Sequence, residues 1–138
     1  MKTLQPDSLK SLIGDLFARA GCGDEEAAVI ADHLVEANLA GHDSHGVIRA
    51  PIYLQWMSQE KVFAGKSIEV VVDSGPLAVA DAGLGYGQWT GRQAVALGVE
   101  KCREHGVAIV ALRNAAHLGR IGTWAEIAAD EGLVSLHF

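Results

Sequence analysis

Four polar side chains gather within ten residues near the end of the first third of the chain: Ser44, His45, Arg49 and Tyr53. If the chain is helical from Gly46 onward, His45, Arg49 and Tyr53 are spaced four residues apart and project from one face. The same face starts at a helix N-terminus, where unpaired N–H groups favour an anion. The spacing therefore predicts a site for a negatively charged ligand.

The residue types at these positions suit a carboxylate ligand and proton transfer to oxygen. Arg49 offers a planar fork that matches a carboxylate, whereas lysine offers only a point charge. Histidine, as at position 45, is the side chain best suited to exchange a proton with a hydroxyl or carbonyl oxygen near neutral pH. Ser44 is expected to orient the imidazole or bond the ligand, and Tyr53 to add a hydroxyl donor. The alternative is a solvated helix face, but such a face more usually carries lysine and glutamate.

A second candidate, Asn114 to Gly122, follows a buried-type strand and precedes a helix, where ligand sites of α/β proteins collect. His117 is a second acid–base candidate, or it packs against a cofactor. Gly119 and Gly122 would let the backbone approach a phosphate or nicotinamide closely, and Arg120 would pair with a phosphate. The alternative, which spacing alone favours, is a histidine that serves only as a structural hydrogen-bonding group.

Two further patterns point away from sites. The glycine-rich run Gly83-Leu84-Gly85-Tyr86-Gly87 precedes a helix, but it reads G-x-G-x-G instead of the dinucleotide fingerprint G-x-G-x-x-G, and no acidic residue ends the following strand. We therefore expect a flexible turn and no Rossmann site. His42 and His45 raise a small metal hydrolase as an alternative, yet the pair has no evident third ligand, and we predict no metal site.

Composition excludes several classes of partner. The 138 residues are 49% hydrophobic and 20% charged, with a net charge of −6 and no cluster of basic residues, which disfavours nucleic acid and anionic lipid. No apolar run approaches the roughly 18 residues that a membrane span requires. The first residues lack the apolar core of a secretory signal, so we expect a cytoplasmic protein in which Cys22 and Cys102 are reduced.

The first 65 residues read as helical. Apolar periodicity and glycine stops predict helices over about 6–20, from Asp24 as N-cap to about residue 40, and over about 46–59 despite Pro51. We interpret residues 1–65 as an N-terminal helical region that carries the substrate motif.

The remaining residues, 66–138, alternate strands and helices. Strands are predicted at about 68–72, 77–80, 107–112 and 133–138, with a long helix ending at Gly106 and a short one over about 123–131. The apolar run from Val107 to Leu112 is typical of a strand with sheet on both sides. Because the last predicted strand stops without a polar cap, we expect the chain to be part of a larger protein or to pair with another copy.

The run from Ala40 to Tyr53, AGHDSHGVIRAPIY, resembles the G-x-D-S-H-G-x-x-R-x-x-x-Y signature of the malate/L-lactate dehydrogenase family. This family is distinct from the Rossmann-type lactate and malate dehydrogenases. Gly83 to Gly85 with the following helix, and Asn114 through Gly122, are similar to family segments in the same order. The family commonly reads Asn-Ser-x-His-Phe-Gly where this chain reads Asn-Ala-Ala-His-Leu-Gly, so a hydroxyl and an aromatic contact are missing here.

The resemblance implies an NAD- or NADP-dependent oxidoreductase with a non-Rossmann mixed α/β fold, of which residues 66–138 would be the incomplete start of the nucleotide-binding domain. It implies His45 as proton donor with Ser44 beside it, Arg49 on the substrate carboxylate and Tyr53 nearby. Some members assign the proton transfer to the histidine that matches His117. The stretch implied to contact the nicotinamide is His117, Leu118, Gly119, Arg120 and Ile121.

The expected function is hydride transfer between NAD(P) and a 2-hydroxy or 2-oxo acid such as malate or lactate, in a homodimer or higher homo-oligomer. Family members are more than twice as long as this chain, so we expect an N-terminal fragment or a truncated product. The rival expectation is a catalytically inactive remnant that serves as an oligomerisation or interaction module.

Overall fold

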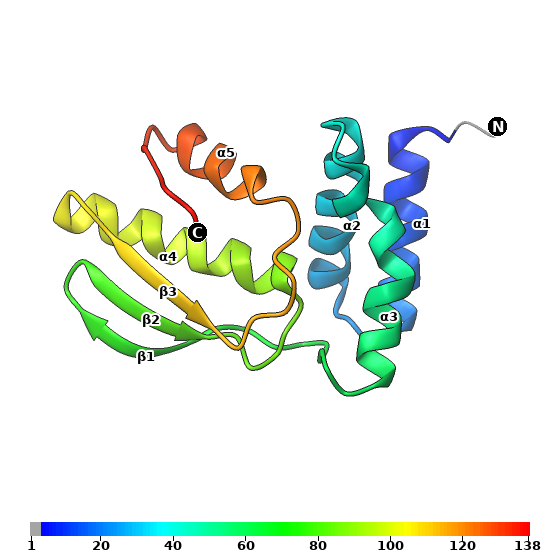
Figure 1. Cartoon of the computed structure of the whole chain (residues 1–138), viewed down its shortest axis with the longest axis horizontal. Coiled ribbons are helices and arrows are strands. Elements are labelled where there is room, and N and C mark those ends of the chain that lie inside the picture. The colour runs from blue at the N-terminus through cyan, green and yellow to red at the C-terminus, as the bar shows by residue number, and fades with distance from the viewer. Residues whose placement is uncertain (1–3) are drawn as a thin grey trace. The chain divides into compact units, whose positions relative to one another are not determined.

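The computed structural model describes residues 4–138 and divides into two compact units, one reaching to Gly65 and one starting at Lys66. The first unit is helical, and the second combines helices with a three-stranded mixed sheet (Figure 1). The prediction of an α/β protein that begins with a helical layer is therefore confirmed.

Two long helices pack together in the first unit. α1 (Pro6–Arg19) begins with a proline, whose fixed φ angle suits the first turn of a helix. It stops before Gly21, which has a φ of +107°. α2 (Asp24–Leu39) stops before another glycine of positive φ. The two helices contact each other, and their buried apolar side chains include Ile13, Phe17, Ile30, Leu34 and Val35.

The start of α2 differs by one residue from the prediction. Gly23 is the N-cap and Asp24 is the first helical residue, so the assignment of Asp24 as the cap is wrong. Glycine is accepted at a cap. The three acidic residues of the first turn, Asp24, Glu25 and Glu26, add a favourable interaction with the positive end of the helix dipole.

The third predicted helix, 46–59, begins later than expected. Two short 3-10 turns, η1 (Asp43–His45) and η2 (Val47–Arg49), precede α3 (Ala50–Ser58). Pro51 stands in the first turn of α3. A regular helix running from Gly46 is disfavoured, because a proline ring inside it would clash with the carbonyl group four residues earlier and would offer no N–H.

The second unit is built on a β-α-β arrangement. β1 (Glu69–Ser74) and β2 (Leu77–Asp81) form an antiparallel hairpin, and β3 (Ile109–Arg113) runs parallel to β2, in the order β1-β2-β3. α4 (Gly87–His105) supplies the long connection that parallel strands require, and it ends where Gly106 takes a φ of +79°.

α4 packs on β3, and α5 (Gly122–Asp130) packs on α4. Ala78 and Ala80 of β2 have no exposed surface. α4 is the longest helix, but no helix within residues 4–138 combines the length and the apolar character needed to cross a membrane.

The segment after α5 contradicts the prediction of a strand over 133–138. These residues have no regular secondary structure, and the side chains of Val134, Leu136 and Phe138 are exposed. Among the described strands, β3 pairs with β2 alone, so the expectation of sheet on both sides is met on one side and stays a prediction on the other. Alternating apolar residues form a strand only where a neighbour supplies hydrogen bonds, and no such neighbour lies beside this segment in the described part of the chain.

Candidate active site

The two 3-10 turns between α2 and α3 carry the first candidate site. Ser44 Oγ lies 2.9 Å from His45 Nδ1, so the hydroxyl either donates to that nitrogen or accepts from it. When the hydroxyl donates, the neutral imidazole carries its proton on Nε2, and when it accepts, Nε2 is free of a proton. When the hydroxyl accepts from Nδ1, Nε2 can take a proton from a ligand hydroxyl group, and the resulting imidazolium can give that proton back. His45 is half-buried, whereas Ser44 is exposed.

Arg49 belongs to the same cluster, although by a contact that the sequence did not predict. It is the N-cap residue of α3, and its Nε donates to the Ser44 carbonyl oxygen at 2.6 Å. Within residues 4–138, no hydrogen bond or ion pair engages its two Nη groups. The guanidinium thus keeps both Nη groups and its full charge for an anionic ligand.

The prediction that His45, Arg49 and Tyr53 share one helical face is wrong. Only Tyr53 lies within an α-helix, since His45 ends η1 and Arg49 ends η2. Tyr53 is 2% exposed, and its ring lies 6.5 Å from that of Phe17 and 5.7 Å from that of Trp56. Its ring therefore packs in the core of the first unit, and a contact from its hydroxyl to substrate stays a prediction.

Asn38, near the end of α2, was missed by sequence reasoning. Its side-chain amide bonds to Asp43 and to the backbone of Val47, on either side of the Ser44-His45 pair. The only available signal was a polar amide standing between Ala37 and Leu39 just before a turn.

The neighbouring histidine gives little support to a metal site. The rings of His42 and His45 lie 6.4 Å apart with an edge-to-face orientation. Among the residues that the structure describes, no group of three His, Cys, Asp or Glu side chains is arranged to hold a metal ion. The metal-hydrolase alternative therefore lacks a set of ligands in this part of the chain.

The second candidate site lies in the second unit, where the chain leaves β3. The loop from Asn114 to Ala116 is bonded to the loop that follows β2: Leu84 N donates to Asn114 O at 2.8 Å, and Ala116 N donates to Gly85 O at 3.3 Å. These two loops follow the carboxyl ends of neighbouring parallel strands, which is the edge of a sheet where ligands bind in α/β proteins.

The glycine-rich run is not the flexible turn that we expected. Gly85 and Gly87 are buried, and a Cβ on Gly87 would lie 2.8 Å from Ala116 O and 2.6 Å from the carbonyl carbon of His117. The neighbouring Gln88 is fully buried, and its Nε2 donates to His117 O at 3.1 Å. The glycines therefore serve to bring the backbone of His117 close to the start of α4.

Asp81 joins the same two loops through its carboxylate. It accepts hydrogen bonds from the Gly83 N–H at 2.9 Å, from Arg113 Nε at 2.7 Å and from Asn114 Nδ2 at 2.8 Å. The Gly83 N–H, followed by the Arg113 and Asn114 side chains, holds the pKa of Asp81 below its usual value. Asn114 has a φ of +51°, a backbone conformation that asparagine tolerates better than most residues.

The remaining residues of this loop are placed unequally for a cofactor. His117 and Leu118 are half-buried, and His117 Nδ1 accepts from the Gly119 N–H at 3.3 Å. Both Nη groups of Arg120 bind the carboxylate of Glu126, one of them at 2.8 Å. A phosphate would have to compete with that carboxylate, so the predicted pairing of Arg120 with phosphate gains no support from this geometry.

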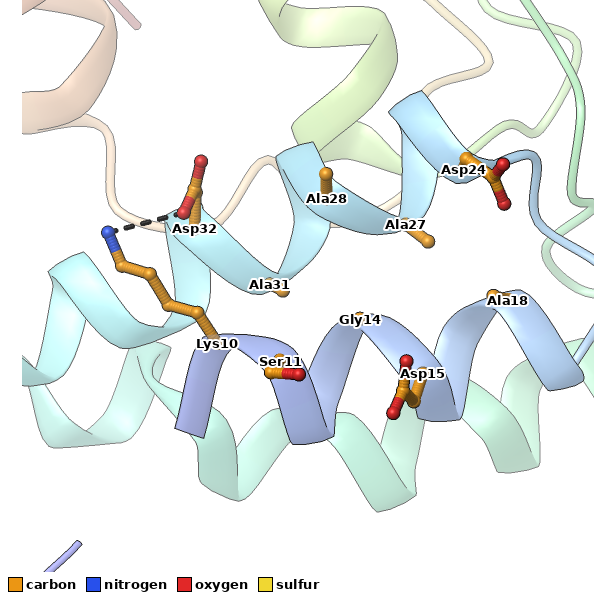
Figure 2. Close-up of a pocket in the computed structure, with 10 residues that line it drawn as sticks. All are labelled: Lys10, Ser11, Gly14, Asp15, Ala18, Asp24, Ala27, Ala28, Ala31 and Asp32. Atoms are coloured by element: carbon orange, nitrogen blue, oxygen red, sulfur yellow. Dashed lines mark ion pairs between the residues drawn. The ribbon is translucent and has the colours of Figure 1, made fainter. Parts of the chain in front are cut away.

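A groove lined by residues of α1 and α2 (Figure 2) shares no lining residue with the first candidate cluster. Its volume is about 360 Å³, and it is lined largely by small side chains. Three carboxylates, Asp15, Asp24 and Asp32, line it as well, and its lysine, Lys10, is paired with Asp32 at 3.2 Å and with Glu36 at 2.7 Å. The excess of negative charge disfavours a carboxylate ligand in this groove.

Comparison with known proteins decides the family. A model described as malate/L-lactate dehydrogenase matches residues 4–138. The chain belongs to the malate/L-lactate dehydrogenase family. The resemblance seen in the run from Ala40 to Tyr53 is thereby confirmed.

Named relatives within the malate/L-lactate dehydrogenase family agree. Hydroxycarboxylate dehydrogenase B of Escherichia coli strain K12 is 44% identical over 95% of the chain, and L-sulfolactate dehydrogenase of Methanocaldococcus jannaschii is 35% identical over 96%. The solved structure of malate dehydrogenase from Pyrococcus horikoshii matches 95% of the chain with a TM-score of 0.91 at 34% identity. That of sulfolactate dehydrogenase from Methanocaldococcus jannaschii matches 93% with a TM-score of 0.90 at 37% identity.

The chain is much shorter than these members of the family. It spans 36% of the Escherichia coli relative and 39% of the Methanocaldococcus jannaschii relative, and 38% and 37% of the two solved chains. Both candidate sites therefore lie in the stretch that the chain shares with longer dehydrogenases.

Proposed function

We propose that the chain provides the proton-transfer and carboxylate-binding groups of an NAD- or NADP-dependent 2-hydroxyacid dehydrogenase. The observation that carries the proposal is the cluster of Ser44, His45 and Arg49. It places an oriented imidazole and a guanidinium with two uncommitted Nη groups on two consecutive 3-10 turns. Membership of a dehydrogenase family makes hydride transfer the reaction in which these two groups have complementary tasks.

In this proposal Arg49 binds the carboxylate of a 2-hydroxy or 2-oxo acid such as malate or lactate, and thereby places the C2 oxygen near His45. In the direction of reduction, His45 gives a proton to the C2 oxygen as C2 receives the hydride. In the direction of oxidation, His45 takes the hydroxyl proton from that oxygen while C2 loses its hydride. A positioned acid or base of this kind typically contributes about 10²- to 10⁴-fold to the rate.

The residues from His117 to Ile121 are proposed to contact the cofactor, and they fit its nicotinamide end better than its phosphates. Half-buried Leu118 offers an apolar side chain to a planar ring beside Gly119, which has no side chain, whereas the guanidinium of Arg120 is held by Glu126. When bound, the nicotinamide would supply or accept the hydride at C2 of the acid. His117 remains a second candidate for the proton transfer.

Isothermal titration of the chain with NADH, with NADPH and with oxamate, an unreactive analogue of a 2-oxo acid, tests the proposal. We expect stoichiometric binding of oxamate that is lost in Arg49→Ala and kept in Gln55→Glu, an exposed change in the same unit. The comparison of NADH with NADPH distinguishes the two cofactors. Failure to bind any of the three ligands, together with a stable homo-oligomer in sedimentation, would favour an oligomerisation module instead.

A further inference from the structure

Asn38 connects the last turn of α2 to both sides of the Ser44-His45 pair. Its Oδ1 accepts the backbone N–H of Val47 at 2.9 Å, and its Nδ2 donates to Asp43 Oδ1 at 2.5 Å. One partner is only a donor and the other, when ionised, only an acceptor, so the amide is required to present one oxygen and one N–H group. Aspartate has the same shape as asparagine but lacks the donor.

Gly46 shows how closely the turn is fitted to this amide. Gly46 is buried, and a Cβ at this position would lie 2.6 Å from Asn38 Nδ2. The backbone of Gly46, with φ −86° and ψ −155°, is open to any residue, so glycine is required here for space and not for conformation. The chain between Asp43 and Val47 therefore wraps around the side chain of Asn38.

The fixed turn holds the two groups that are proposed to meet the substrate. The Ser44 carbonyl, which lies between the two Asn38 contacts, accepts the hydrogen bond from Arg49 Nε. The Ser44 hydroxyl in turn contacts His45 Nδ1. A change in the path of the backbone at this turn would therefore reorient both the imidazole and the guanidinium.

We infer that Asn38 is a positioning residue, which sets the orientation of His45 and Arg49 by bridging Asp43 and Val47. The inference rests on the proposed function for its catalytic meaning, but the bridge itself is a property of the free chain. It needs neither cofactor nor substrate to be measured.

The decisive comparison uses Asn38→Asp and the double variant Asn38→Asp/Asp43→Asn. The single variant keeps an acceptor atom for Val47, but its carboxylate faces that of Asp43, and their repulsion should displace the side chain from the Val47 N–H. The double variant exchanges donor and acceptor, which restores a hydrogen bond of the same shape. Gln55→Glu, exposed on α3, controls for the added negative charge.

The readouts are the 15N resonances of the His45 imidazole and hydrogen exchange at the Val47 amide in the free chain, and oxamate affinity by titration. For Asn38→Asp we expect a shifted His45 resonance, faster exchange at Val47 and about tenfold weaker oxamate binding, since a lost hydrogen bond beside a charged group is worth about one decade. In the double variant, the His45 resonance, the Val47 exchange rate and the oxamate affinity should all return most of the way to their wild-type values. The circular dichroism of every variant should match that of the wild type.

The inference is overturned if folded Asn38→Asp keeps the wild-type His45 resonance, or if the double variant recovers none of the three readouts. If Asn38→Asp loses its circular dichroism, Asn38→Ser replaces it, because the serine hydroxyl is too short to bridge Asp43 and Val47. Asn38→Ser is then judged by the His45 resonance and the Val47 exchange rate in the free chain. If the wild-type chain does not bind oxamate, the proposed function fails. The His45 and Val47 measurements still decide whether Asn38 positions the turn.

Discussion

The carbonyl carbon of His117 lies so close to Gly87 that a side chain on Gly87 would begin 2.6 Å from it. Gly87 is the first residue of α4, and His117 follows β3, so this contact joins two segments thirty residues apart. The adjacent hydrogen bond from Gln88 to His117 O strengthens the same contact. The position of His117 thus depends on the absence of a methyl group.

Gly87→Ala should destabilise the chain even though alanine is the better helix former. Alanine gains up to about 1 kcal/mol in a helix interior and less at the first residue of a helix, whereas forcing a methyl group into a packed backbone costs about 1–3 kcal/mol. We expect a net loss of about 1–2 kcal/mol in the free energy of unfolding, measured by urea denaturation. Gly98→Ala is the matched control on the same helix, because its Cβ would lie 3.5 Å from Val110 Cγ2, an ordinary contact. Gly98→Ala should be neutral or stabilising, and equal losses from both variants would contradict the argument.

Arg49→Lys should weaken carboxylate binding about as much as Arg49→Ala. Lysine keeps the charge, but all its donors sit on one tetrahedral nitrogen, so it cannot bond the Ser44 carbonyl and also offer a carboxylate the planar, two-nitrogen fork of a guanidinium. We expect at least about a tenfold rise in the dissociation constant for oxamate, since a charge-assisted hydrogen bond is worth about 1.5–3 kcal/mol. The measurement is titration calorimetry at fixed ionic strength. Wild-type affinity in Arg49→Lys would show that the guanidinium fork does not contact the ligand.

The loops held by Asp81 should loosen in acid. Because the pKa of Asp81 in the folded chain lies below the value of about 3.9 for an unfolded aspartate, its contribution to stability is present above pH 4 and is lost as the pH falls through the folded value. Asp81→Asn should therefore reduce the free energy of unfolding more at pH 6 than at pH 2.5. Urea denaturation of the wild type and of Asp81→Asn at pH 6 and pH 2.5 provides the comparison. A difference in the free energy of unfolding that does not change with pH would contradict the prediction.

The thiol of Cys22 should resist alkylation in the folded chain. Burial, together with the nearby Glu26, raises the pKa of Cys22 to about 12, so almost no thiolate exists at pH 8. In a Cys102→Ser variant, iodoacetamide should label Cys22 rapidly only after unfolding in urea. The raised value also predicts that stability present below about pH 8.5 falls as the pH rises from there toward 12. Prompt labelling of the folded variant would show that Cys22 is accessible.

Local signals in the sequence account for most of the secondary structure. Glycines of positive φ end α1, α2 and α4, as the stops at Gly21, Gly41 and Gly106 predicted. These predictions succeeded because a helix end depends on its own few residues. The predicted strand over 133–138 failed because a strand depends on a neighbour that no local pattern reveals.

The sequence predicted which residue types make up the candidate site, but it did not predict how their side chains are arranged. The residue types Ser44, His45 and Arg49 suggested acid–base and carboxylate chemistry, but Pro51 disfavours the single helix that would have aligned them. The role of Asn38 depends on a contact across five to nine residues, which side-chain identity alone does not disclose.

The bond from Arg49 Nε to the Ser44 carbonyl has a thermodynamic consequence for recognition. Immobilising a long, flexible side chain costs up to about 1.5–2 kcal/mol in lost rotamer entropy. In this chain the cost is met during folding, because a backbone carbonyl already holds the guanidinium by one of its three nitrogens. Under the proposed function, a carboxylate would therefore meet a preorganised partner, and more of its interaction energy would be left for affinity.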